Sequence, residues 1–150
     1  MTYKVQLEQV SPRSLAAVRE TTNKQRLSAD IRRLLDLVWP VIRAQGVKFG
    51  HNVVVYYPVI DGQFAIEAGV EVGPEFVSTD QVKLAATPAG EVATVAYFGE
   101  YSQMGEGYAA LDQWCAEHGR RRAGVSWEVY GDWNDDPAKL RTDIYTLLAQ

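Results

Sequence analysis

The chain has few of the residues that staple small proteins together by covalent or metal bonds. Its 150 residues include one cysteine and two histidines, so an intrachain disulfide is impossible. His51 and His118 do not fall in a ligand-spaced cluster, and neither a metal nor a cofactor is expected. Cys115 lies on the apolar stripe of an expected helix, which favours buried packing over a nucleophilic role.

Long apolar runs are also missing. The sequence has no apolar segment of about 18 residues, the minimum for a membrane-spanning helix. Its first residues, MTYKVQLEQV, lack the basic stretch and apolar core of a secretory signal. We therefore expect a cytoplasmic protein that does not enter a membrane.

Basic residues are too few and too scattered for a phosphate-binding surface. The formal net charge is -4 and the isoelectric point is near 5.2, whereas duplex binding draws on clustered Lys and Arg. The basic run at 120–122 follows an expected helix end, where it complements the helix dipole or lies in solvent. No basic helical pair precedes the first strands, and direct nucleic-acid binding is not expected.

What is present is typical of one compact domain. Hydrophobic residues make up 47% of the chain and charged residues 23%, which are ordinary values for a globular protein. A length of 150 residues can bury a core without disulfides. We expect a single domain over residues 1–150.

The first half predicts two strands, a helix and two more strands. The strands are expected at 4–10, 15–21, 53–59 and 64–72. The helix is expected from Ser28, as N-cap, to about Gln45, with Gly46 as C-cap and with Pro40 bending or ending its last turns. The pair Asp61-Gly62 predicts a hairpin turn, and alternation places Glu67 and Glu71 toward solvent.

The second half repeats this order. Strands are expected at 92–98, 125–131 and 141–148, and the connector at 73–90 is expected to hold a short strand near 81–86. Ser102 is expected to cap a helix that Gly119 closes. Strand, helix, strand, strand thus occurs twice, at about 1–75 and 90–150, which indicates an internal duplication with a pseudo-twofold axis.

The predicted class is α+β: duplicated β-α-β-β modules that form one antiparallel sheet, with two helices packed on one face and a concave ligand face at the pseudo-axis. Aligning the tyrosines of the third elements sets VVY at 54–56 against EVY at 128–130. Val54 therefore occupies the place of Glu128. We expect Glu128, Tyr130 and Tyr56 to converge on the concave face.

The stretch SWEVYGDW at 126–133 places Glu128 on a strand rich in aromatic residues. Alternation sets Glu128 and Tyr130 on one face and Trp127, expected in the core, on the other. Glu128 is then either a solvated strand residue or a pocket carboxylate. Aromatic rings with one carboxylate suit an apolar-bodied cation, since the rings supply stacking and the carboxylate supplies countercharge.

Three segments together resemble the GyrI-like effector-binding family, which also occurs as the ligand domain of multidrug-responsive transcription activators. They are VAYFGEYSQMGEGYAALDQWCAEHG, SWEVYGDWNDDP and TDIYTLL, and the resemblance covers nearly the whole chain. It implies a pocket between the two halves. It also implies that Glu128, which matches a buried glutamate of the family, receives lipophilic cationic ligands.

The expected ligand-binding residues follow from the strand pattern and the resemblance: Glu128, Tyr130, Tyr56, Tyr145, Trp133 and Tyr101. Tyr145 lies on the strand expected beside that of Glu128, and Trp133 just beyond it. Tyr101 is expected near the pseudo-axis or as an anchor of its turn. Tyr108 and Trp114 fall on the helix stripe and are interpreted as core.

Three functions remain open at this point. The first is a standalone binding domain for a lipophilic cationic aromatic ligand. The second is a hydrolase of electrophilic or cyclopropane-bearing compounds, as the family implies, in which Glu128 is the base and Tyr130, Tyr56 or Tyr145 the donor. Strand rise separates Glu128 and Tyr130 by roughly 6 to 7 Å, so this pairing is expected to need a tyrosine from another strand. The third is a protein that binds gyrase or a regulator, as the gyrase-inhibiting members of the family imply.

Overall fold

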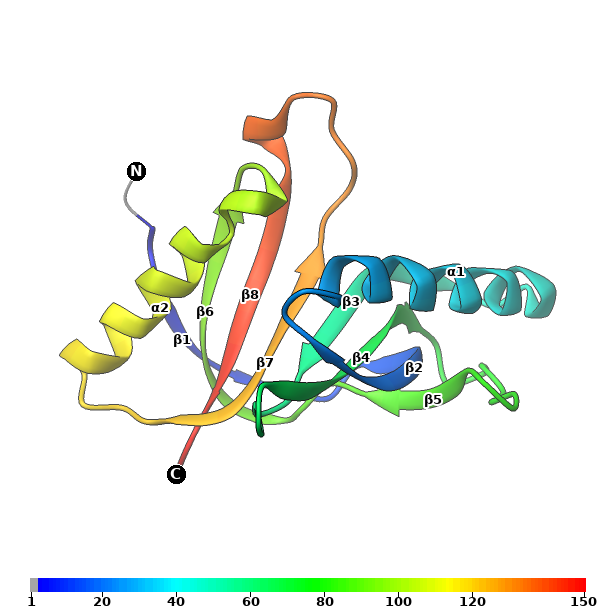
Figure 1. Ribbon diagram of the computed structural model, residues 1–150, viewed down its shortest axis with the longest axis horizontal. Helices are drawn as coiled ribbons and strands as arrows, with labels where there is room; N and C mark the ends of the chain where they lie inside the picture. Colours follow the sequence, from blue (N-terminus) through cyan, green and yellow to red (C-terminus); the bar gives the residue numbers. More distant parts are fainter. Residues whose placement is uncertain (1–2) are drawn as a thin grey trace. The chain divides into compact units, whose positions relative to one another are not determined.

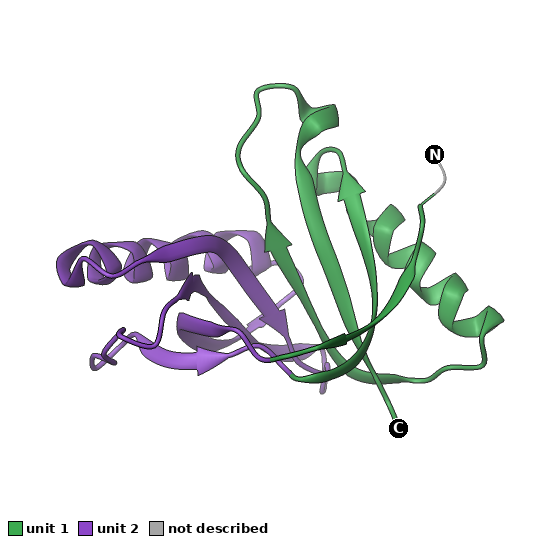
Figure 2. Cartoon of the chain, turned by 180° about the vertical axis from the view of Figure 1, so that it is seen from behind, with its two compact units in different colours: residues 1–11, 89–150 green, residues 12–88 purple. Residues whose placement is uncertain are grey.

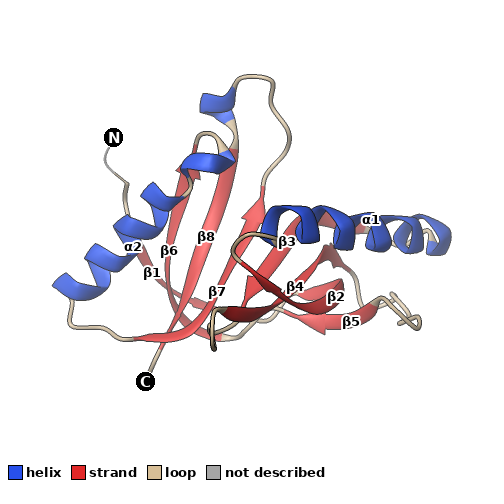
Figure 3. Cartoon of the chain, viewed as in Figure 1, coloured by secondary structure: helices blue, strands red, loops and turns tan. Residues whose placement is uncertain are grey.

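The computed structural model describes residues 3–150, and over these residues it has eight strands and two α-helices (Figures 1 and 3). The strands are β1 (Gln6–Val10), β2 (Ser14–Asn23), β3 (Phe49–Tyr56), β4 (Gln63–Val72), β5 (Lys83–Ala86), β6 (Gly90–Phe98), β7 (Arg122–Tyr130) and β8 (Arg141–Leu148). The helices are α1 (Leu27–Gln45) and α2 (Gly105–Glu117), with short 3-10 helices η1 (Tyr101–Gln103) and η2 (Pro137–Lys139). The strands pair antiparallel, which confirms the predicted α+β class.

The chain divides into two compact units (Figure 2). Unit 2 is Pro12–Pro88, and unit 1 combines residues 1–11 with Ala89–Gln150. Unit 2 has the strand order β3-β4-β2-β5, and unit 1 has the order β7-β8-β6-β1. The two orders correspond strand for strand. The edge strand of unit 1 is β1, which comes from the N-terminal segment. The division into units therefore differs from the predicted repeats at 1–75 and 90–150.

Within unit 2, α1 packs on β2 and β4 and buries Leu34, Val38 and Ile42. Gly46 ends the helix as expected: it has φ 63°, and its N–H donates to the carbonyl of Ile42. Pro40 lies inside the helix, which continues to Gln45, so the expectation of an early end is wrong. Ile42, which lies beyond Pro40, is still buried. Its packing offsets the loss of the backbone hydrogen bond that proline cannot make.

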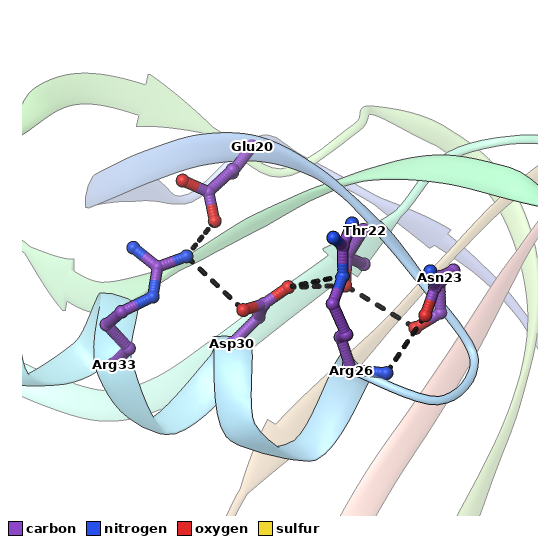
Figure 4. Close-up of polar contacts among 6 residues, drawn as sticks. All are labelled: Glu20, Thr22, Asn23, Arg26, Asp30 and Arg33. Atoms are coloured by element: carbon purple, nitrogen blue, oxygen red, sulfur yellow. Dashed lines mark hydrogen bonds and ion pairs between the residues drawn. The ribbon is translucent and has the colours of Figure 1, made fainter.

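The start of α1 is held by side chains at the end of β2 rather than by Ser28 (Figure 4). The Thr22 hydroxyl donates to Asp30 Oδ2 at 2.6 Å, and Asn23 Oδ1 accepts from the N–H of Arg26 at 3.0 Å. Arg33 bridges Asp30 and Glu20. The hydrogen bond from Thr22, followed by that from Arg33, lowers the pKa of Asp30. The negative charge thus lies in the first turn, where the helix dipole favours it.

Two glutamates of β4 are less exposed than the alternation predicted. Glu67 Oε1 accepts from the Tyr57 hydroxyl at 2.5 Å. Glu71, with its side chain 14% exposed, accepts from the backbone N–H of His51 and pairs with Arg13. Burial, followed by the bond to Glu67, raises the pKa of Tyr57 to about 12. Alternation assigns a side chain to a face of the sheet, but it does not say what covers that face.

Within unit 1, α2 packs on β6 and β8. The helix begins at Gly105 after the 3-10 turn η1, so Ser102 does not cap it. Cys115 is buried in the core cluster as expected, and burial raises the pKa of its thiol. A Cβ on Gly107 would lie 2.7 Å from Ile144 Cδ1. Glycine at this position therefore lets the helix approach β8 closely.

Charged residues around these elements are paired locally. In the basic run, Arg120 pairs with Glu91, and Arg122 Nη1 lies 2.6 Å from Asp112 Oδ1. Both arginines therefore interact with nearby carboxylates of unit 1. Neither helix in residues 3–150 is long and apolar enough to cross a membrane.

The close contact of β4 with β2 makes Gly69 a strict requirement. A Cβ there would lie 2.1 Å from the carbonyl oxygen of Ala16 and 2.8 Å from Ala17 Cα, and backbone atoms of a paired strand cannot move aside. We expect Gly69→Ala to lower the free energy of unfolding by about 1–3 kcal/mol, measured by urea denaturation. Gly105→Ala, with nothing within 4 Å of the new methyl, is the control and should leave stability unchanged or slightly raised. Equal losses would contradict this account.

The anchor at the start of α1 predicts an acid-dependent loss of stability. The folded pKa of Asp30 lies below its ordinary value of 3.8. Its contribution is therefore fully present above that pH and is lost as the pH falls through the lower folded value. We expect Thr22→Val to raise the pKa of Asp30 and to weaken this dependence, as read from carboxyl NMR titration. The exposed neighbour substitution Thr21→Val should change neither quantity, and an unshifted pKa in Thr22→Val would rule the anchor out.

Candidate ligand-binding site

The side chain of Glu128 lies on the face of the unit 1 sheet that α2 covers. Glu128 stands directly opposite Ile144 in the β7–β8 register, and Ile144 belongs to the core cluster that includes Leu111 of α2. Directly opposed residues share a face. The expectation that Glu128 points to a face without helices is therefore wrong. Sequence alternation separated Glu128 from Trp127 correctly, but it could not say which face the helix takes.

The carboxylate of Glu128 is buried, with 5% of the residue exposed. Its Oε2 accepts from the Tyr108 hydroxyl of α2 at 2.5 Å, and its Oε1 accepts from the Tyr130 hydroxyl. Burial of a carboxylate is costly unless hydrogen bonds replace its water. Donors to an ionised carboxylate make the stronger bonds, so both phenols stabilise a negative charge.

The bond between Tyr130 and Glu128 corrects the spacing argument made from the sequence. Strand rise separates backbone positions, whereas a tyrosine side chain is long enough to place its hydroxyl beside a residue two positions back on the same face. Glu128 therefore pairs with the tyrosine of its own strand and with one from α2. No tyrosine of a neighbouring strand is needed for the pairing.

A series of aromatic contacts connects this carboxylate with an exposed tyrosine of unit 1. The ring of Tyr101, in η1, meets the half-buried ring of Tyr130 edge-on, with centroids 5.7 Å apart. Tyr101 is 44% exposed. An edge-to-face pair places the positive ring edge against a negative ring face. Glu128 thus contacts Tyr130, and Tyr130 contacts Tyr101. All three residues are among those that the sequence predicts for the site.

A second buried polar group lies beside Glu128. Thr142 stands opposite Tyr130 on β8, is fully buried, and its Oγ1 has no hydrogen-bond partner among the described residues. The corresponding positions of unit 2 are Val54, in place of Glu128, and Ile66, opposite Tyr56. Both are buried aliphatic residues. One repeat therefore has an ordinary apolar core where the other carries polar groups, a local departure that is typical of functional sites.

Tyr145 lies on the opposite sheet face of unit 1, and Trp133 lies in a loop of the same unit. Tyr145 stands opposite Trp127 and stacks on it, with centroids 5.3 Å apart and planes 6° from parallel, so it occupies the face away from Glu128. Trp133 is 72% exposed in the loop after β7, and its Nε1–H donates to Asp135 at 3.2 Å. Tyr56 belongs to β3 of unit 2, where its ring contacts Phe64.

Two residues at the site were missed by the sequence analysis. The apolar stripe of α2 predicts Tyr108 as a core residue, and Thr142 is not among the predicted site residues. A signal for Tyr108 was available, since a tyrosine facing a core needs an acceptor for its hydroxyl, and Glu128 is a natural acceptor. Nothing in the local pattern marks Thr142. In residues 3–150, no group of three or more His, Cys, Asp or Glu could hold a metal ion.

Solved structures share this fold. The C-terminal domain of EcmrR matches with a TM-score of 0.81 at 19% identity, over 100% of this chain and 99% of that one. The longer EcmrR chain, solved in a complex with DNA, matches with a TM-score of 0.82 at 18% identity, over 99% of this chain and 58% of that one. SAV2435 bound to tetraphenylphosphonium matches with a TM-score of 0.71 at 14% identity, over 99% and 94% of the two chains. A hydrolase from Listeria innocua matches with a TM-score of 0.67 at 13% identity, over 97% and 92%.

Sequence comparison gives the family directly. A search of curated proteins finds no match. The model of the GyrI-like small molecule binding domain, however, matches residues 3–149. That match takes in both units and every helix and strand described above. The chain therefore belongs to the family of GyrI-like small-molecule binding domains.

Proposed function

We propose that the protein binds a lipophilic, cationic aromatic compound and that Glu128 supplies the countercharge. The observation that carries this proposal is a buried carboxylate whose two oxygens accept from Tyr108 and Tyr130. Such an arrangement preserves a negative charge in an environment of low dielectric. Attraction to a cation is several times stronger there than in water.

The residues around Glu128 suit the body of such a ligand. The rings of Tyr130 and Tyr101 offer π faces that attract cations and stack on aromatic groups. A buried Thr142 hydroxyl gives one further polar contact. The set therefore combines one charge, aromatic surface and a hydroxyl, which is the usual composition of a small-molecule site.

A structural neighbour supports the same class of ligand. SAV2435 was solved bound to tetraphenylphosphonium, a cation that carries four aromatic rings and has no hydrogen-bond donor. A compound of this kind is recognised through charge and ring contacts. A carboxylate whose oxygens already accept from phenols is suited to that mode of recognition.

Replacement of Glu128 by glutamine tests the countercharge. We expect Glu128→Gln to weaken binding of tetraphenylphosphonium at least tenfold, because removing one member of a buried charge pair costs about 2–5 kcal/mol, and to leave a neutral aromatic analogue unaffected. Tryptophan fluorescence titration measures both. The exposed Glu8→Gln in β1 makes the same change in net charge and should bind as wild type. Unchanged cation affinity in Glu128→Gln would overturn the proposal.

The phenol bonds give a second test. Tyr108→Phe removes one donor to the carboxylate, and we expect it to weaken cation binding about three- to tenfold, in keeping with the net contribution of about 0.5–1.5 kcal/mol from one hydrogen bond. Tyr145→Phe removes a hydroxyl from the opposite sheet face and should have no effect. Calorimetric titration of the two variants compares them directly. Equal losses would mean that the hydroxyl of Tyr108 has no special role at the site.

A hydrolase of electrophilic compounds is the second candidate function. The observation that favours it is the direct contact of a carboxylate with two phenols, which pairs a general base with proton donors. A structural neighbour from Listeria innocua is described as a hydrolase. Mass analysis of an electrophilic test compound after incubation separates the two functions: an intact compound supports binding alone, and a product that is absent with Glu128→Ala supports catalysis.

A further inference from the structure

A hollow lies within unit 1, between α2 and the segment that leads into β1. Its volume is about 520 Å³, which falls within the range of small-molecule sites. Tyr3 and Val5 line it on one side, and residues of α2 from Glu106 to Glu117 line it on the other. Neither Glu128 nor its phenol partners take part. The hollow is therefore separate from the candidate site described above.

The lining residues of α2 form one stripe along the helix. They recur at three- or four-residue spacing, so they lie on the same side. Glu117 lies eleven positions after Glu106 on the helix, a rise of about 16 Å. The small side chains of Ala109 and Ala110 and the ring of Trp114 lie between the two glutamates. The groove thus has a carboxylate at each end and, between them, mainly apolar groups together with the amide of Gln113.

Both terminal carboxylates are available to a cation. In the described part of the chain, neither Glu106 nor Glu117 belongs to an ion pair, and Glu117 accepts a hydrogen bond from Gln113 at 2.9 Å. Asp112, one position before Gln113, is by contrast paired with Arg122. Burial, followed by the charge of Glu106, raises the pKa of Tyr3. The charge of Glu106 therefore acts on the side of the groove that Tyr3 lines.

We propose that this groove binds a linear organic dication whose two ammonium groups are separated by an apolar chain. One ammonium lies at Glu106 and the other at Glu117. The methylene chain between them covers Ala109, Ala110 and the ring of Trp114. A ligand with further charges along its chain fits less well, because the middle of the groove offers an amide and apolar groups rather than a third carboxylate.

Dependence on ligand length tests this assignment. The probe is dodecamethylene diammonium, compared with tetramethylene diammonium and hexylammonium, titrated into the nitrogen-15-labelled protein at low salt. We expect the long dication to shift the indole N–H signal of Trp114 and the amide signals of α2, and to bind more tightly than either comparison compound. The combined Glu106→Gln, Glu117→Gln variant should lose about two- to fivefold affinity per carboxylate, as for exposed ion pairs. Added salt should weaken binding.

Matched variants separate this groove from the Glu128 site. Glu8→Gln should keep the affinity for the long dication, and Glu128→Gln should keep it as well. Equal binding of all three compounds, or binding that survives loss of both groove carboxylates, would overturn the proposal. Loss of binding in Glu128→Gln alone would assign the dication to the Glu128 site instead. Tight binding of a basic peptide with no binding of the diammonium would replace the small-molecule assignment with a protein partner.

Discussion

The candidate site depends on the burial of one carboxylate beneath a helix. A carboxylate inside a protein core is stable only where hydrogen bonds replace its lost water. Tyr108 and Tyr130 provide those bonds to Glu128. They can do so because α2 lies close to β8, where Gly107 leaves room for Ile144. The packing of the helix and the charge of the site therefore have a common structural cause.

The internal duplication makes the departure at this site visible. Both units follow the same strand order, and in unit 2 the positions that correspond to Glu128 and Thr142 hold Val54 and Ile66. Unit 2 thus has an aliphatic core under α1, which supports the fold without a buried charge. Unit 1 has a carboxylate and an unpartnered hydroxyl at the same depth. A duplicated fold can conserve its architecture in both copies while one copy carries the polar groups.

Aromatic residues have different roles according to the face they occupy. Tyr130 and Tyr101 share the face of Glu128, whereas Tyr145 stacks on Trp127 across the same strands. Tyr130, Tyr145 and Trp127 all lie near Glu128 in sequence or strand register. Only their side of the sheet distinguishes a contact with the carboxylate from a packing contact. The outer groove of α2 adds a third arrangement, in which Trp114 lies between two exposed glutamates.

The sequence by itself determined the α+β class, the extent of β8, the turn at Asp61-Gly62 and the C-cap at Gly46. It also singled out Glu128 and Tyr130, whose roles in ligand binding stay predictions. These features depend on local periodicity, on residues with special backbone preferences, or on a family motif. Tertiary structure decided what no local pattern contains: which sheet face α2 covers, that Tyr108 bonds Glu128, that Tyr145 lies on the other face, and that Thr22 and Asn23 hold the start of α1 in place of Ser28. Each of these involves residues distant in sequence or packed from different elements. Their contacts follow from how whole elements pack, because packing brings together side chains that sequence spacing alone cannot relate.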